Sequence, residues 1–162
     1  MKKLIPTLTK LSLLLIFLLL SQTPSFSQNS GYGVGLIAGE PTGVSFKSWL
    51  DSATAWDFAV AWSFKGDNSF TLHGDYLKHR FGLFPVAKGD LPLYFGVGGT
   101  LRFNDDAGQT AFGARIPVGL DYHFEDLPLG AFLEVVPVLD LFPETDIRLN
   151  AAIGIRYFFG SQ

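Results

Sequence analysis

The chain contains no cysteine. This absence excludes disulfides, thiolate metal sites and a lipoprotein anchor, which needs a cysteine to acylate. An excess of positive charge is also missing, since 12 Lys and Arg stand against 15 Asp and Glu for a formal net charge of −3. An acidic chain with scattered cations argues against nucleic acid as a partner. The length of 162 residues suits a single domain.

Long apolar runs are absent except for one near the amino terminus. Leu11 to Leu20 is almost purely apolar, and three lysines precede it. Ten apolar residues are too few for a membrane-spanning helix, which needs about 20. Ser25 and Ser27 then supply the small residues of a cleavage site. We therefore predict that residues 1–27 are a secretory signal peptide and that 28–162 form the mature domain.

Beyond the leader, no segment has a helical period. Instead, apolar and polar residues alternate in eight stretches separated by turn residues, which is the pattern of a membrane-spanning β-barrel. The predicted strands are 31–39, 42–50, 55–64, 69–79, 93–103, 110–124, 129–142 and 148–159. The predicted fold class is all-β, an eight-stranded antiparallel up-and-down transmembrane barrel.

The size and charge of the side chains on the two faces of each predicted strand indicate which face points outward. In the third predicted strand Trp56 alternates with Asp57, but a half-buried strand of a soluble protein would alternate in the same way. In the fifth, the face opposite the aromatic residues carries Gly96, Gly98 and Arg102. Very small residues beside a long charged one suit a narrow polar lumen and would make a poor water-facing surface. We therefore predict an apolar exterior and a charged interior.

The same alternation predicts that nearly equal numbers of acidic and basic side chains point into the lumen. Because an isolated buried ion is costly, these charges should pair into a structural salt-bridge network. The predicted members are Lys47, Asp57, Asp75, Arg102, Arg115, Asp121, Glu134, Asp140 and Arg156. A five-residue connection over 143–147 would place Glu134 opposite Arg156, so we predict that these two residues form a cross-strand pair.

Two prolines disturb the pattern. Pro117 and Pro137 lie inside predicted strands, where proline cannot donate to the hydrogen-bond ladder. A closed barrel has no free edge to accommodate them. We therefore predict a β-bulge at each proline, which would shift the inside–outside alternation beyond it.

Several motifs resemble the small outer-membrane β-barrel proteins of bacteria, in particular a family of short-looped, mostly uncharacterised barrels grouped with the outer-membrane-protein-A fold. The motifs are GEPTGVS at 39–45, LYFGVG at 93–98, RIPVGL at 115–120 and FLEVVPVLDL at 132–141. The resemblance implies an integral outer-membrane barrel in the Gram-negative envelope, monomeric and in contact with membrane lipid, and it names no activity. Near the chain end, Gly154, Tyr157 and Phe159 resemble the signal read by the outer-membrane assembly machinery.

Alternative functions remain open. A soluble lipocalin-like carrier of a small apolar ligand would need an apolar lumen, which the inward charges contradict. An outer-membrane lipid-modifying enzyme would need a serine activated by histidine and a carboxylate. His73 and His123 each lie near an acid but have no serine at short spacing, and the scattered histidines do not form a metal site. We predict no catalytic residue, no cofactor, and a structural or unassigned envelope role.

The connections between strands offer little surface for a receptor, and eight strands leave no room for a solute pore. The longest connection, 80–92, falls on the periplasmic side and contains Phe81, Leu83, Phe84 and Val86. We predict a mobile loop here; packing against the barrel mouth or against a partner is the alternative.

Overall fold

The structure is a computed structural model that describes residues 30–63, 69–104 and 109–160. The predicted signal peptide, residues 1–27, lies outside the described residues. So do most of the predicted turns at 65–68 and 104–108. Within the described part of the chain, no helix is long and apolar enough to cross a membrane.

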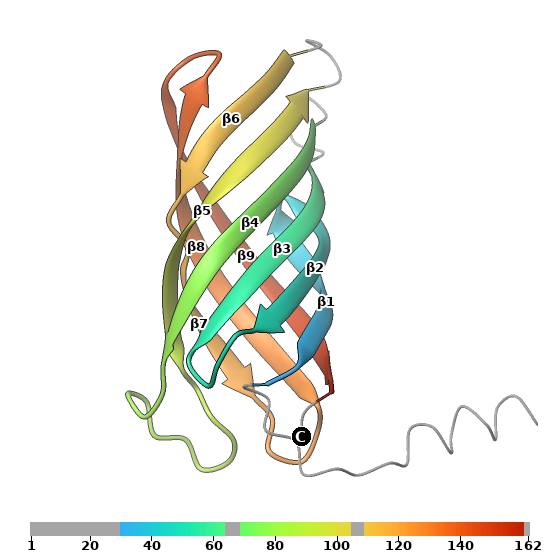
Figure 1. Cartoon of the computed structure of the whole chain (residues 1–162), viewed down its shortest axis with the longest axis vertical. Helices are drawn as coiled ribbons and strands as arrows, with labels where there is room; N and C mark the ends of the chain where they lie inside the picture. The colour runs from blue at the N-terminus through green and yellow to red at the C-terminus, as the bar shows by residue number, and fades with distance from the viewer. Residues whose placement is uncertain (1–29, 64–68, 105–108, 161–162) are drawn as a thin grey trace, which may run out of the picture.

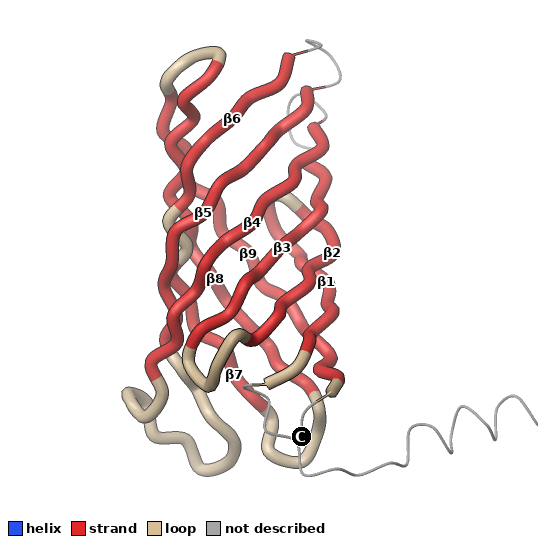
Figure 2. The backbone as a smooth tube through the Cα atoms, viewed as in Figure 1, coloured by secondary structure: helices blue, strands red, loops and turns tan. Residues whose placement is uncertain are grey.

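The described residues form one closed antiparallel sheet (Figures 1 and 2). Its strands are β1 (Tyr32–Glu40), β2 (Thr42–Trp49), β3 (Thr54–Ser63), β4 (Ser69–Arg80), β5 (Leu93–Asn104), β6 (Gln109–Arg115), β7 (Val118–His123), β8 (Leu129–Phe142) and β9 (Asp146–Phe159). Strands adjacent in sequence pair with each other except β6 and β7, and β9 closes the ring on β1. β6 and β7 lie end to end between β5 and β8 and fill one position of the ring. The predicted eight-stranded up-and-down barrel is confirmed, with the predicted sixth strand divided in two.

The strand registers fix the tilt of the barrel. A row of paired residues that starts at Phe158 on β9 passes once around the ring and returns to β9 at Arg148, ten positions earlier. The intervening residues are Gly33, Lys47, Asp57, Asp75, Gly98, Arg115 and Val138. Ten residues at ~3.3 Å against eight strand spacings of ~4.8 Å give a tilt of about 40°. An eight-stranded barrel of this shape has an interior that side chains can fill.

The predicted bulges at Pro117 and Pro137 are wrong. Arg115 pairs with Gly98 before the β6–β7 break, and Val118 pairs with Phe95 after it, so the register across the break is unchanged. The alternation of buried and exposed residues also continues through both prolines. The inside–outside assignments beyond them therefore need no correction.

The two prolines leave the register intact because the two backbone amide donors that they lack would lie next to each other in the sheet. The amide of Ile116 donates to the carbonyl of Pro137 at 3.0 Å, and the amide of Gly96 donates to the carbonyl of Pro117 at 2.9 Å. In each such closely spaced pair the return bond would come from the proline nitrogen, which has no hydrogen. Two ladder bonds are lost side by side and no residue is inserted. The loss divides the strand into β6 and β7.

The pairing of β6 with β8 does shift its register, but between Phe112 and Gly113 and not at a proline. Phe112 pairs with Phe142, whereas Gly113 pairs with Asp140, so Leu141 is the extra residue of a β-bulge. Leu141 and Phe142 are consequently both exposed. No sequence signal marked this bulge.

The two faces of the wall differ in the way that the alternation predicted. Large apolar side chains cover the outside, with Leu36, for example, 63% exposed, while the Lys47 side chain on the inside is fully buried. This is the reverse of the distribution in a water-soluble protein, where charges face water and apolar groups are enclosed.

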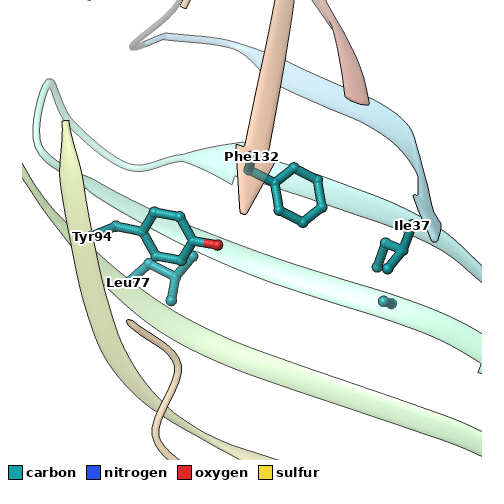
Figure 3. Packing of buried hydrophobic residues seen from close by; sticks show 5 residues of the cluster. Ile37, Leu77, Tyr94 and Phe132 are labelled. Carbon is teal, nitrogen blue, oxygen red and sulfur yellow. The ribbon is translucent and has the colours of Figure 1, made fainter. Parts of the chain in front are cut away.

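A small apolar cluster lies within this charged interior. Tyr94 and Leu77 lie side by side, and Phe132 and Ile37 face them from the opposite wall (Figure 3). Ala59 completes the cluster. Its members come from five strands, so the cluster ties distant parts of the ring together. The interior is therefore a packed mixture of apolar and ionised groups.

Candidate functional site

The lumen is the candidate site, because it gathers the buried ionisable side chains of the described residues. One end of the barrel holds both Tyr32, where β1 begins, and its partner Phe159, where β9 ends. We refer to it as the termini end, and to the opposite end, which carries the β8–β9 turn, as the far end (Figure 1).

Aromatic and imidazole rings close the termini end. We call this set the aromatic plug: Trp49, His79, Phe81, His123 and Phe158, with Ala55 packed among them. The ring centroids of Trp49 and His79 are 4.4 Å apart, and those of His123 and Phe158 are 5.9 Å apart. Phe158 is fully buried although its neighbours on β9 face outward. The plug leaves the charged interior cut off from this end.

Phe81 belongs to the β4–β5 connection, and its position corrects the prediction that this connection is mobile. Its ring lies 5.9 Å from that of His123 inside the plug. Farther along, Asp90 exchanges two backbone hydrogen bonds with His123, at 3.1 and 2.8 Å. The connection is therefore anchored to the barrel at both ends, as the alternative allowed.

Lys47 lies immediately above the aromatic plug. Its Nζ donates to Asp121 Oδ2 at 2.6 Å and to His79 Nε2 at 2.8 Å. Because an ammonium group can only donate, Nε2 must accept, and the hydrogen of the His79 ring lies on Nδ1. Nδ1 then donates to the carbonyl oxygen of Ala53 at 3.2 Å. This geometry holds a neutral His79 in one tautomer between a buried ammonium group and the backbone.

Arg156 binds the second buried carboxylate. Its guanidinium donates to Asp57 and, through Nε, to Ser45 Oγ at 3.0 Å. The guanidinium carbon also lies 3.9 Å from the centre of the Phe132 ring, which is a cation–π contact. Asp57 is also opposite Lys47 across β2 and β3, so both cations lie near the Asp57 carboxylate.

Glu134 is not the partner of Arg156, contrary to the prediction. The β8–β9 register places Glu134 opposite Ala152 and sets Arg156 opposite Gly130. The physical reason is the position of the turn: Asp140 pairs with Asp146, so the five residues between the last paired residues are 141–145 and not 143–147. Moving the turn by two residues shifts the partner of every residue in this hairpin by four.

Glu134 instead joins a group in the middle of the lumen. The Tyr94 hydroxyl donates to Glu134 Oε2 at 2.9 Å, and Arg115 Nη2 lies 3.6 Å from Glu134 Oε1. Arg115 Nε also forms an ion pair with Asp75 Oδ1 at 2.9 Å. An internal cavity of about 10 Å³ borders Glu134, Arg115 and His73, with room for about one water.

A triad of Arg102, Asp140 and Arg148 occupies the far end. Arg148 binds the Asp140 carboxylate through two nitrogens, at 2.7 and 2.8 Å, and Arg102 Nη2 approaches it to 3.1 Å. A cavity of about 230 Å³ opens above the triad. Glu144 and Asp146 lie on its rim. The far end is therefore polar and open, unlike the closed termini end.

The structure places all nine predicted site residues inside the barrel and brings each into an ion pair. Sequence reasoning missed Arg148, which lies at the edge of a predicted strand. Its position eight residues before Arg156 put it on the same face and could have identified it. With Arg148 included, five cations face five carboxylates, so the charges of the network balance.

The chemistry available to this arrangement is limited. Ser45 is the buried serine nearest the charges, and its hydroxyl accepts from Arg156 rather than facing a histidine. Among the described residues, no group of three or more His, Asp and Glu is arranged to hold a metal ion. The ionised side chains of the lumen are therefore bound chiefly to one another.

Comparisons with known proteins agree with the observed architecture. No protein-family model and no curated protein matches the chain. The N-terminal β-barrel domain of Pseudomonas aeruginosa OprF is similar in structure, with a TM-score of 0.61 and 17% sequence identity over 79% of this chain and 95% of that domain. Neisserial surface protein A (NspA) has a TM-score of 0.49 and 13% identity over 79% of this chain and 93% of its own. At these identities the likeness concerns the fold alone: the chain has the eight-stranded fold of small outer-membrane barrels.

Proposed function

We propose that this chain is an integral protein of the bacterial outer membrane, a monomeric barrel whose lumen is filled by side chains and whose role in the envelope is structural. One observation supports it above all: the exterior is apolar and the buried interior is ionised. A hydrocarbon environment favours such a surface, and a closed ring satisfies the backbone groups that lipid cannot.

The interior supports a structural role over transport or ligand binding. The aromatic plug closes one end, and the ion pairs of Lys47, Arg156 and Arg115 cross the middle. A lipocalin-like carrier would bury an apolar ligand, and ten ionised side chains leave no apolar space for one. For the same reason we propose no catalytic activity.

The outer surface of the barrel indicates which partners to propose. The closed ring has no unpaired strand edge through which a second copy could add, so we propose a monomer surrounded by membrane lipid. Tyr157 and Phe159 project outward near the end of β9, with ring centroids 4.7 Å apart. We propose that this strand end is what the assembly machinery contacts during insertion.

The location is tested by fractionating cells that express the full-length chain. The protein should remain in the outer-membrane fraction after a carbonate wash, and it should migrate faster on gels before heating than after, because a closed barrel resists detergent until it is boiled. Recovery in the soluble periplasmic fraction, with the same mobility in both samples, would contradict the proposal.

The filled lumen predicts a separate result. Purified protein inserted into planar bilayers should give no stable conductance steps, because side chains occupy the whole cross-section. The matched control is the same preparation with a porin added, which shows that the bilayer reports channels. Steady, large conductance steps from this protein alone would mean that the plug and the charge network leave an open path.

A further inference from the structure

The β4–β5 loop, residues 81–92, carries chemistry that the filled lumen does not explain. Its start is held by Phe81 in the aromatic plug. Its end is held by the backbone pair between Asp90 and His123 and by the Tyr122 hydroxyl, which donates to the carbonyl of Lys88 at 2.9 Å. Gly89 has a φ of 70°, and a Cβ there would clash with the carbonyl oxygen of His123. The loop therefore follows a specific path along the barrel end.

Between these anchors the loop exposes apolar side chains. Leu83 is 55% exposed and Phe84 is 45% exposed, and Pro85 and Val86 beside them are exposed as well. Figure 1 shows the loop projecting beyond the lower ends of β4 and β5. An anchored loop that holds contiguous apolar groups away from its own protein offers them to another surface.

The adjacent outer wall indicates which surface this is. Lys78 and Arg80 are the last two outward-facing residues of β4, and both are exposed. They lie opposite Phe95 and Leu93 of β5, on the face that is apolar elsewhere. A cation on the lipid-facing wall is stable only at the headgroup level, where its long side chain can reach phosphate. The two cations therefore mark the edge of the apolar band, and the loop begins one residue after Arg80.

The acidic groups near Lys78 and Arg80 form no described ion pair with them, so both cations can bind an external anion. Asp51, in the β2–β3 turn, accepts hydrogen bonds from the Thr54 hydroxyl and from the Ala53 amide at 2.8 Å, and these bonds lower the pKa of Asp51. The positive charge of Lys78 also lowers the pKa of Asp51, but no described ion pair involves Lys78 or Arg80. Three further acids lie at this end, Asp90, Glu125 and Asp126, and Asp126 is paired at 3.7 Å with Lys88 of the loop.

We infer that residues 83–86 insert into the boundary between headgroups and acyl chains of the leaflet at the termini end, while Lys78 and Arg80 bind phosphate groups of anionic phospholipids. Apolar side chains flanked by cations are the composition that binds such an interface. This inference rests on the proposed membrane location and names the lipid contact of that same barrel. The loop then fixes the depth of the barrel in the bilayer.

Because the chain has no cysteine, a single introduced cysteine carries a unique probe. Phe84→Cys is labelled with a small fluorophore and reconstituted into vesicles of phosphatidylcholine and phosphatidylglycerol. Quenching is measured with nitroxide on the lipid headgroup, with nitroxide deep on the acyl chain, and with iodide in water. Val60→Cys, on the outer wall of β3, reports insertion of the barrel, and Glu144→Cys reports the far end.

The label at position 84 should be quenched by headgroup nitroxide and protected from iodide, whereas the label at 60 should respond to acyl-chain nitroxide and the label at 144 to iodide. If position 84 responds only to iodide while position 60 is quenched from the acyl chains, the barrel is inserted and the inference is wrong; a periplasmic partner is then the occupant to seek. If position 60 is not quenched by any lipid, the proposed membrane location itself fails.

The role of Lys78 and Arg80 is measured in the same vesicles. With the nitroxide placed on phosphatidylglycerol, quenching at position 84 should exceed that with nitroxide on phosphatidylcholine. Adding Lys78→Gln and Arg80→Gln should abolish this preference and leave the response at position 60 unchanged. An equal preference with and without the two cations would overturn the phosphate contact.

Discussion

Replacing Arg156 with methionine is expected to lower the free energy of unfolding by about 3–5 kcal/mol, the largest single effect in the lumen. The fully enclosed guanidinium binds Asp57 and Ser45 and lies over the Phe132 ring. Methionine fills much of the same volume but leaves the Asp57 carboxylate without this partner in a low-dielectric interior. The measurement is reversible denaturant unfolding from lipid vesicles.

A double-mutant cycle separates the charge from the packing. Asp57→Asn alone should also be costly, whereas the double variant Asp57→Asn and Arg156→Met should lose much less than the sum, since no unpaired ion remains. The exposed pair of Lys88 and Asp126 supplies the matched control, and Lys88→Gln should cost at most about 1 kcal/mol. Strictly additive losses at Asp57 and Arg156 would show that their ion pair does not stabilise the barrel.

An arginine on the outer wall at Val60 is expected to cost about 2–4 kcal/mol, the next largest effect. Val60 is exposed near the middle of β3, between the outward-facing Phe58 and Trp62, so the substituted guanidinium would lie in the hydrocarbon core. Leu50→Arg is the control, because Leu50 is also an exposed apolar residue but lies at the termini end beyond β2. It should cost only about 0–1 kcal/mol. Equal costs at the two positions would mean that the wall does not face a bilayer.

The inside–outside pattern could be predicted from the sequence, because it depends only on the two-residue period of a strand. Lys47, Asp57 and Arg115 face inward whatever residues lie opposite them, so their burial follows from parity alone. The pairing of Glu134 depends in addition on where the β8–β9 turn lies along the chain. An error of two residues in that position moved the predicted partner by four residues, from Arg156 to Ala152.

The predicted bulges at the two prolines are wrong for a different reason. A single missing donor inside a closed sheet favours a bulge, and the sequence alone shows two such donors far apart along the chain. The structure places Pro137 opposite Ile116 and Pro117 next to it, so the two losses coincide and no extra residue is needed. Such coincidence depends on the register of two strands distant in sequence, which no local pattern contains. The bulge at Leu141 and the anchoring of Phe81 are long-range properties of the same kind.

The apolar face of the wall is expected to meet lipid while the charged face is enclosed, and measurements along β3 test this most directly. Single cysteines placed in turn at residues 56–62 of the cysteine-free chain, spin-labelled and reconstituted in vesicles, report collision rates with oxygen, which concentrates in lipid, and with a water-soluble nickel complex. Labels at 56, 58, 60 and 62 should collide with oxygen and not with nickel, and labels at 57, 59 and 61 should collide weakly with both. Strong nickel collisions at the even positions would show a wall that faces water and would contradict the account.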